Sequence, residues 1–258
     1  MINTVQSWLK EQETTRQMEQ SFKTTSLDEF LSWGAKCESN FDRDTLDGFY
    51  RGYMGAGQKS FEFNKCLRFG FDKYYSMFPQ FINDPFLNKE AVENRVKKLD
   101  KLTRGFKLPR DCRGFRYVDE NYIISQFKGY LKNYENLIRL DRYGYETIPR
   151  DKITIDELHN ALSKSIGQRI RQDNGFTSFS LVEKNTHMGK KNNPDEYKRI
   201  LLRYDCEEGT ECYVSQYVRE SECMFPRNTH FFVKDVTKEV GDDGNERVVI
   251  LYGIAGQQ

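Results

Sequence analysis

The spacing of apolar residues predicts that the first part of the chain is helical. Between Glu90 and Leu102, apolar side chains recur at positions 92, 96, 99 and 102, a spacing close to that of a helix. The segment 83–85, Asn-Asp-Pro, stands ahead of it as a helix-start signal, and residues 24–29, Thr-Thr-Ser-Leu-Asp-Glu, have the pattern of another capped start. Glycines at 52, 55, 57 and 70 divide the region into short pieces. We therefore predict a helical layer, up to about residue 108, that packs on a sheet.

After Pro109 the pattern changes to short apolar runs that are typical of strands. Residues 115–118 are a strand candidate, whereas residues 154–166 read as a helix that Gly167 ends. Gly, Asn or Pro occupies many of the gaps between six further strand candidates: 176–181, 199–204, 211–218, 222–225, 229–236 and 247–252. This order predicts an α+β fold, with a helical N-terminal region over residues 1–85 and a second domain over residues 86–258.

Composition and charge narrow the class of protein. The 258 residues are 37% hydrophobic and 31% charged, a globular balance, and the aromatic content of 14% favours sheets over a small helical bundle. A net charge of +1 argues against nucleic acid as the primary partner, since such surfaces carry a basic excess. No apolar run suits a signal peptide or approaches the roughly 20 residues of a membrane span. We expect a cytoplasmic, monomeric protein.

The cysteines indicate neither a metal site nor a catalytic thiol. The six cysteines form no CxxC pair, and no Cys/His spacing resembles a zinc site, so we expect no metal. We interpret them as reduced thiols, with Cys206, Cys212 and Cys223 as small residues of the core or of strands.

Two carboxylates stand two positions apart at Glu220 and Glu222. Side chains at such a spacing point to the same side of an extended segment, where their like charges resist being held together. A partner cation or a reaction usually explains such a pair, although solvated surface strands also carry it. The apolar segment 223–226, Cys-Met-Phe-Pro, follows directly and reads as a buried strand, which favours a functional interpretation of the pair.

Two more segments carry candidate chemistry. Ser178 and Ser180 share one face of a predicted strand, and Phe176 and Phe179 give that strand its apolar bulk. Arg116 stands between two aromatic residues in an earlier strand, where its guanidinium would be partly buried and would bind an anion such as a phosphate. Taken singly, each segment is also compatible with an ordinary surface strand.

The order of the three segments resembles a known family. An aromatic residue with Arg116, then Phe-x-Ser-x-Ser at 176–180, then Glu-x-Glu at 220–222, resembles the arginine–serine–glutamate class of ADP-ribosyltransferases, the cholera-toxin-like and ecto-transferase-like group. The resemblance spans about residues 90–252 and includes segment 222–231, which is similar to the family's Glu-x-x-hydrophobic-Pro-x-x-Thr-x-Phe run. It implies a bacterial toxin or effector, or a bacteriophage enzyme that modifies host proteins, acting inside a host cell.

The chain departs from the family pattern at two positions. The family usually has Gly after the arginine, where this chain has Tyr117, so the larger side chain must point away from the ligand. Phe179 replaces the middle Thr of the Ser-Thr-Ser motif, while both serines are kept. A rival alignment uses Arg113 and Gly114 as the Arg-Gly pair, but the residues on either side of Arg116 fit a strand better.

The resemblance implies a split β-sandwich over residues 86–258 that binds NAD⁺ as cosubstrate between two small sheets. Glu222 would stabilise the positive charge that develops on the ribose as nicotinamide leaves. Glu220 would align the guanidinium of an acceptor arginine and accept its proton, because Glu at this position goes with arginine targets in the family and Gln with others. Tyr217 would contact the target protein.

The same resemblance implies contacts with NAD⁺. Arg116 would hold a phosphate or the nicotinamide ribose, Ser178 would orient Glu222, and Ser180 would support the strand. The other implied contacts are the backbone of Tyr117, a ring of Phe176 or Phe179 beneath the nicotinamide, and Lys184 near the pyrophosphate.

Two other functions fit the same residues. The site could hydrolyse NAD⁺ or modify a side chain other than arginine, because water or another nucleophile can take the same ribose. A silent NAD⁺- or protein-binding module that kept the fold is a second alternative, against which the intact Arg116, Ser178, Glu220 and Glu222 speak.

Overall fold

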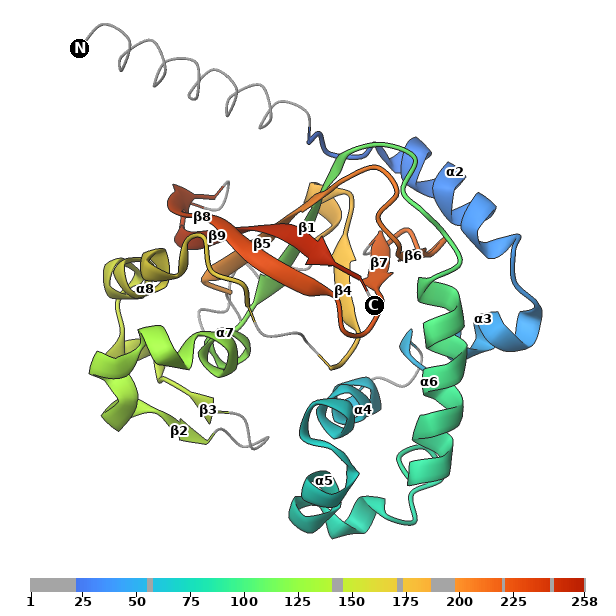
Figure 1. The fold of residues 1–258 in the computed structure, drawn as a ribbon, viewed down its shortest axis with the longest axis horizontal. Coiled ribbons are helices and arrows are strands. Elements are labelled where there is room, and N and C mark those ends of the chain that lie inside the picture. The colour runs from blue at the N-terminus through green and yellow to red at the C-terminus, as the bar shows by residue number, and fades with distance from the viewer. Residues whose placement is uncertain are drawn as a thin grey trace, which may run out of the picture.

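Helices flank both ends of a central sheet in the computed structural model, which describes residues 22–54, 58–140, 146–170, 174–186, 198–219, 221–241 and 244–257 (Figure 1). The helices are α2 (Leu27–Glu38), α3 (Arg43–Tyr50), α4 (Gln58–Phe69), α5 (Phe71–Met77), α6 (Lys89–Thr103), α7 (Glu120–Phe127) and α8 (Ile155–Leu162). The 3₁₀ helices are η2 (Pro79–Phe81), η3 (Lys128–Tyr130), η4 (Lys132–Leu137), η5 (Arg150–Lys152), η6 (Ser163–Ser165) and η7 (Glu183–Asn185).

The strands come almost entirely from the second part of the chain. They are β1 (Cys112–Val118), β2 (Arg139–Leu140), β3 (Glu146–Thr147), β4 (Thr177–Ser180), β5 (Ile200–Cys206), β6 (Tyr213–Val214), β7 (Glu222–Phe225), β8 (His230–Val240) and β9 (Glu246–Gly256). Seven of them form one sheet in the order β6-β7-β4-β1-β5-β9-β8, and β2 pairs with β3. The predicted α+β fold is therefore confirmed.

The sheet consists of two parts that are joined at one place. The strands β1 and β4 pair through Phe115 and Ser180 alone, whereas β1 and β5 pair over seven positions. One part is β6-β7-β4 and the other is β1-β5-β9-β8, with β5 and β9 parallel. Such a narrow junction lets the two parts turn relative to each other, which is the split arrangement that the resemblance implies.

Local capping explains where the N-terminal helices begin. Ser26 and Glu29 form a reciprocal capping box at the start of α2, as the sequence predicts. The predicted start signal at 83–85 is wrong by several residues, because α6 begins at Lys89 with Asn88 as its N-cap. Asp84 instead accepts hydrogen bonds from the backbone amides of Phe86 and Leu87, which closes a turn ahead of the helix.

Three predicted strands differ clearly in length from those observed. The prediction over 211–218 shrinks to Tyr213–Val214, because the chain turns at Ser215, whose amide donates to the carbonyl of Glu222 across the loop. The predicted strands at 229–236 and 247–252 extend into the long hairpin of β8 and β9. Gly244, with a φ of 78°, lies in its turn, a conformation that glycine adopts without strain.

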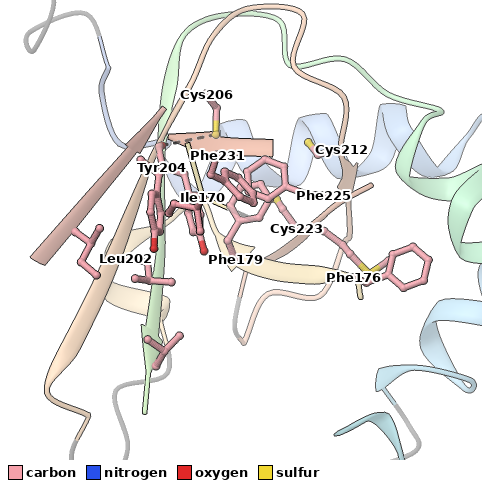
Figure 2. Close-up of a cluster of buried hydrophobic side chains, with 14 of the residues drawn as sticks. Ile170, Phe176, Phe179, Leu202, Tyr204, Cys206, Cys212, Cys223, Phe225 and Phe231 are labelled. Carbon is pink, nitrogen blue, oxygen red and sulfur yellow. Dashed lines mark hydrogen bonds between the residues drawn. The ribbon is translucent and has the colours of Figure 1, made fainter. Parts of the chain in front are cut away.

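Stacked aromatic rings fill the core beneath the sheet (Figure 2). Phe179 stacks on Phe225 with 4.0 Å between ring centroids, and Tyr204 and Phe231 lie 5.3 and 5.5 Å from the ring of Phe225. Each such ring contributes about 1.5–3 kcal/mol by leaving water, so the high aromatic content has a structural use here. All six cysteines are free and buried, and Cys206 is among those that line this cluster.

Gly114 leaves room for the ring of Phe179. A Cβ atom at position 114 would lie 2.6 Å from Cδ2 of Phe179. The Phe179 ring cannot move away easily, because it stacks on the ring of Phe225. We expect Gly114→Ala to lower the free energy of unfolding by about 1–3 kcal/mol through overpacking. Thermal unfolding should show a fall of roughly 2–4 °C per kcal/mol. Gly129→Ala is the matched control, since a Cβ there meets nothing within 4 Å. Equal melting temperatures for the two variants would contradict this account.

Candidate active site

Two neighbouring strands place Ser178 and Glu222 on a shared face of the sheet. Glu222 is the first residue of β7 and pairs with Ser180 of β4, two positions after Ser178. Directly paired residues of an antiparallel sheet project to the same side, as do residues two apart on one strand. The side chains of Ser178 and Ser180 therefore lie on the face of Glu222, whose side chain is only 6% exposed.

Tyr53 reaches this face from the helical region. It follows α3, is 8% exposed, and places its hydroxyl 3.3 Å from Oγ of Ser178. Asn64 of α4 donates from Nδ2 to the Tyr53 hydroxyl at 2.9 Å, while its Oδ1 accepts from the backbone amide of Phe176 at 2.9 Å. The turn after α3 and the helix α4 are thus tied to the start of β4 by a chain of three hydrogen bonds.

The phenol of Tyr53 lies within electrostatic reach of both predicted charges. Burial raises its pKa, and the negative charge of Glu222 raises it further. The hydrogen bond with Ser178 and the positive charge of Arg116 act in the opposite direction, as does the hydrogen bond from Asn64. The Tyr53 hydroxyl thus lies within hydrogen-bonding distance of Ser178 and within electrostatic range of Arg116 and Glu222.

Arg116 brings a poorly satisfied cation to the site. Its guanidinium carbon lies 4.9 Å from the ring centroid of Tyr122, and that of Arg68 lies 5.7 Å from the same ring. Burial opposes the charge of Arg116, but the neighbouring Tyr122 and Tyr204 hold its pKa above the ordinary value. Among the residues that the structure describes, none forms a hydrogen bond with the buried Nη1 of Arg116. A buried donor without a hydrogen-bond partner costs about 1–3 kcal/mol of folding free energy. An anion that binds to this donor would recover that cost.

The neighbours of Arg116 in β1 point elsewhere. Tyr117 packs in a small cluster with Phe115 and two strand neighbours, separate from the main core, and Arg247 lies over its ring at 5.1 Å. Arg113 donates from Nε and Nη2 to the buried carboxylate of Asp205, at 2.9 and 2.8 Å. These contacts give Arg113 a structural partner and favour Arg116 as the arginine of the site.

The other residues that are predicted to contact NAD⁺ lie in the core, at a strand end or on the surface. Phe176 is fully buried and stacks 6.2 Å from Phe63, and Phe179 belongs to the core stack, so both rings have protein packing roles. Ser180 supports the end of its strand, because its hydroxyl donates to the carbonyl of Val182 at 2.8 Å and accepts from that residue's amide. Lys184 is exposed in η7. Contact of these residues with NAD⁺ stays a prediction.

Hydrogen bonds of Ser215 close the base of the loop that precedes Glu222. Ser215 donates from its hydroxyl to the Glu222 carbonyl at 2.7 Å and accepts from the Tyr217 amide at 3.2 Å. Ser221 has a φ of 45°, which brings the chain sharply back into β7. Tyr217 is half-buried beside this stem, and Glu220 lies outside the described residues.

Sequence reasoning missed Tyr53, Asn64 and Arg68. All three lie in or between helices that the sequence predicts as a packing layer, and an aromatic or amide side chain there reads as an ordinary helix residue. Only the tertiary arrangement brings them to the strands. No pair of sequence positions signals that arrangement, because it depends on how the helical region packs against the strands.

Comparisons with known proteins agree with the fold. The chain belongs to the ADP-ribosyltransferase exoenzyme family, whose sequence model matches residues 49–253. It is therefore an NAD⁺-dependent mono-ADP-ribosyltransferase of a family that includes toxins. A search of curated protein sequences gave no match.

Solved structures of bacterial proteins share the fold. An ADP-ribosyltransferase from Clostridium botulinum aligns with a TM-score of 0.57 and 17% identity, over 91% of this chain and 98% of its own. A protein from S. aureus, solved with NAD, has a TM-score of 0.56 and 15% identity over 92% and 99%. The ADP-ribosylating toxin BECa of C. perfringens, solved with NADH, has a TM-score of 0.58 and 15% identity, over 86% of this chain and 47% of its own.

Metal sites and membrane-spanning helices are two further features that bear on function. Within the described ranges, no cluster of His, Cys, Asp and Glu side chains is arranged to hold a metal ion. No helix in the same part of the chain combines the length and the apolar character that a membrane crossing requires.

Proposed function

We propose that the enzyme transfers ADP-ribose from NAD⁺ to an arginine side chain of a target protein inside a host cell, and releases nicotinamide. The observation that carries the proposal is the hydroxyl of Tyr53, which lies 3.3 Å from Oγ of Ser178 and within electrostatic range of Glu222 and Arg116. A carboxylate, a hydroxyl and a cation are supplied there by three separate strands, and the Glu222 carboxylate is largely buried from water. Charges act more strongly in such a site than in water.

The charged residues suit two parts of NAD⁺, a phosphate and the ribose that carries nicotinamide. The buried Nη1 of Arg116 offers a donor to a phosphate oxygen, and Arg68 adds a second positive charge beside the same ring. Glu222 supplies the carboxylate of the site, and it would stabilise the ribose as positive charge develops there. Ser178 would hold that carboxylate in place, directly or through Tyr53.

The helical region takes part in this site. Tyr53 and Asn64 precede residue 86, the predicted start of the catalytic domain. Even so, the Tyr53 hydroxyl lies within hydrogen-bonding distance of Ser178 in β4, and Asn64 accepts from the amide of Phe176 directly before that strand. We propose that the described part of this region, residues 22–54 and 58–85, completes the catalytic domain rather than forming an independent module. A monomeric state stays a prediction.

Arginine is the proposed acceptor because of Glu220. A protonated guanidinium is a poor nucleophile, and a carboxylate two residues before the catalytic one can align it through two hydrogen bonds and accept its proton. The Glu-x-Glu spacing and the closed stem at Ser215 support this role for the loop.

Incubation with tagged NAD⁺ and a cell lysate tests the proposal. We expect one or a few labelled protein bands, with mass spectrometry locating ADP-ribose on arginine. Glu220→Ala should abolish the labelling but keep the hydrolysis of NAD⁺, because its carboxylate serves the acceptor and not the glycosidic bond. Modification of another residue type would refute the arginine assignment alone. Hydrolysis without any labelled protein would make the enzyme a glycohydrolase.

A further inference from the structure

One face of α2 lies along the open edge of the sheet. Strand β6 is the last strand on that side, and α2 runs beside it (Figure 1). A Cβ atom on Gly34 would come within 2.5 Å of the Ser215 carbonyl oxygen, and the thiol of Cys37 interacts with the Val214 backbone. Positions 34, 37 and 38 share one side of a helix, so Glu38 points to the same edge.

The carboxylate of Glu38 gathers donors from three elements. Its Oε1 accepts from the hydroxyl of Tyr50 at the end of α3, from the hydroxyl of Tyr213 in β6 at 2.8 Å, and from the backbone amide of Gln216 at 3.0 Å. Its Oε2 accepts from the side-chain amide of Gln216 at 3.0 Å. Glu38 is only 8% exposed. A buried carboxylate is tolerated only when hydrogen bonds satisfy it in this way.

Gln216 is the first residue of the loop that carries Tyr217 and Glu220. The pairing of β6 with β7 ends at Val214, and Ser215 makes the last bonds across the loop to Glu222. The amide of Gln216 is therefore the first in the loop that no strand neighbour satisfies, and Glu38 and Tyr50 accept it instead. In effect the helix takes the place of a missing strand at this edge.

Glu222 does not depend on this arrangement in the same way. Its strand is held from the other side by β4, through the four paired positions from Ser180 to Thr177. The two ends of the loop thus have different supports: the end at Gln216 rests on Glu38 of α2, and the end at Glu222 rests on the sheet.

We propose that Glu38 is a positioning residue that fixes the acceptor loop, 216–221, for transfer to a protein while leaving the cleavage of NAD⁺ to the strand residues. This rests on the proposed function, in which the loop receives the acceptor. Loss of the Glu38 carboxylate removes the acceptor of the Gln216 side chain and one of the two acceptors of its backbone amide, so the start of the loop is no longer held in one position. The acceptor side chain then meets the activated ribose less often, and water takes its place.

The test compares transfer with hydrolysis in Glu38→Ala and in Tyr50→Phe, a milder change that removes one hydroxyl and keeps the ring. Hydrolysis is followed with etheno-NAD⁺ alone, and transfer is followed as labelling of the lysate protein that the wild type modifies. We expect the ratio of transfer to hydrolysis to fall at least 10-fold in Glu38→Ala and less in Tyr50→Phe. Glu38→Gln, which keeps an acceptor oxygen, should restore part of the ratio.

Glu29→Ala is the matched control, because Glu29 belongs to the same helix, caps its start and pairs with Arg110 far from the loop. It should lower the melting temperature and keep the wild-type ratio. An unchanged ratio in both Glu38→Ala and Tyr50→Phe, or an equal loss of the two activities, overturns the positioning role while the proposed function stands. A wild type that labels no protein overturns both.

Discussion

Glu222→Gln is expected to reduce both the hydrolysis of NAD⁺ and the transfer of ADP-ribose by about 10²–10³-fold or more. Glutamine keeps the size and the backbone of the residue, and so keeps its pairing with Ser180 and the bond from Ser215. It removes the negative charge. A neutral amide cannot offset the positive charge on the ribose, which is the interaction that strengthens between the bound state and the transition state.

Rates with etheno-NAD⁺ at saturation, together with labelling by tagged NAD⁺, measure this loss. The affinity for NAD⁺ should change much less than the rate, because the charge on the ribose appears only during the reaction. Glu207→Gln, at an exposed position directly after β5, provides a control of the same chemistry at a distance from the site. Retention of full transfer activity in Glu222→Gln would remove the central assumption of the mechanism.

Most of the strands could be located along the chain because each rests on a local pattern, whereas their order in the sheet does not follow from such patterns. Segment 222–225 is observed with the predicted bounds, and the helix predicted at 90–102 is α6 with one more residue at each end. Apolar periodicity and turn residues act within a few positions, so one sequence suffices to detect them. The helix start predicted at 83–85 is wrong for a related reason. Asp84 has a side chain that is typical of an N-cap, but here it accepts hydrogen bonds that close a turn ahead of the helix.

Convergence in space could not be predicted in the same way. Arg116, Ser178 and Glu222 were found through the order of short segments, whereas Tyr53 reaches Ser178 across 125 positions of sequence, and no local pattern marks it. Glu38 is a similar case. In the sequence it is one more charged residue at the end of a helix, and only the packing of α2 on the sheet edge turns it into the acceptor of Tyr213 and Gln216.

Arg116→Met is expected to separate ligand binding from stability. The long apolar side chain of methionine can occupy the space of the arginine stem and pack on the Tyr122 ring. The variant loses a buried donor without a described partner, and also the repulsion from Arg68. The melting temperature should therefore stay equal or rise by a few degrees, because exchange of a poorly paired buried charge for an apolar group is often neutral or stabilising.

Affinity for NAD⁺ should fall in the same variant by about 10- to 100-fold, as expected when one or two charge-assisted hydrogen bonds of about 1.5–3 kcal/mol are lost. Titration calorimetry measures this affinity.

Arg113→Met is the control, for which we expect lower stability and unchanged affinity for NAD⁺. That change leaves Asp205 with Lys234 as its remaining ion-pair partner among the described residues. A loss of stability in Arg116→Met with unchanged affinity would show that the guanidinium serves the fold. Because the two arginines lie three positions apart on one strand, their contrast tests directly which of them evolved for the ligand.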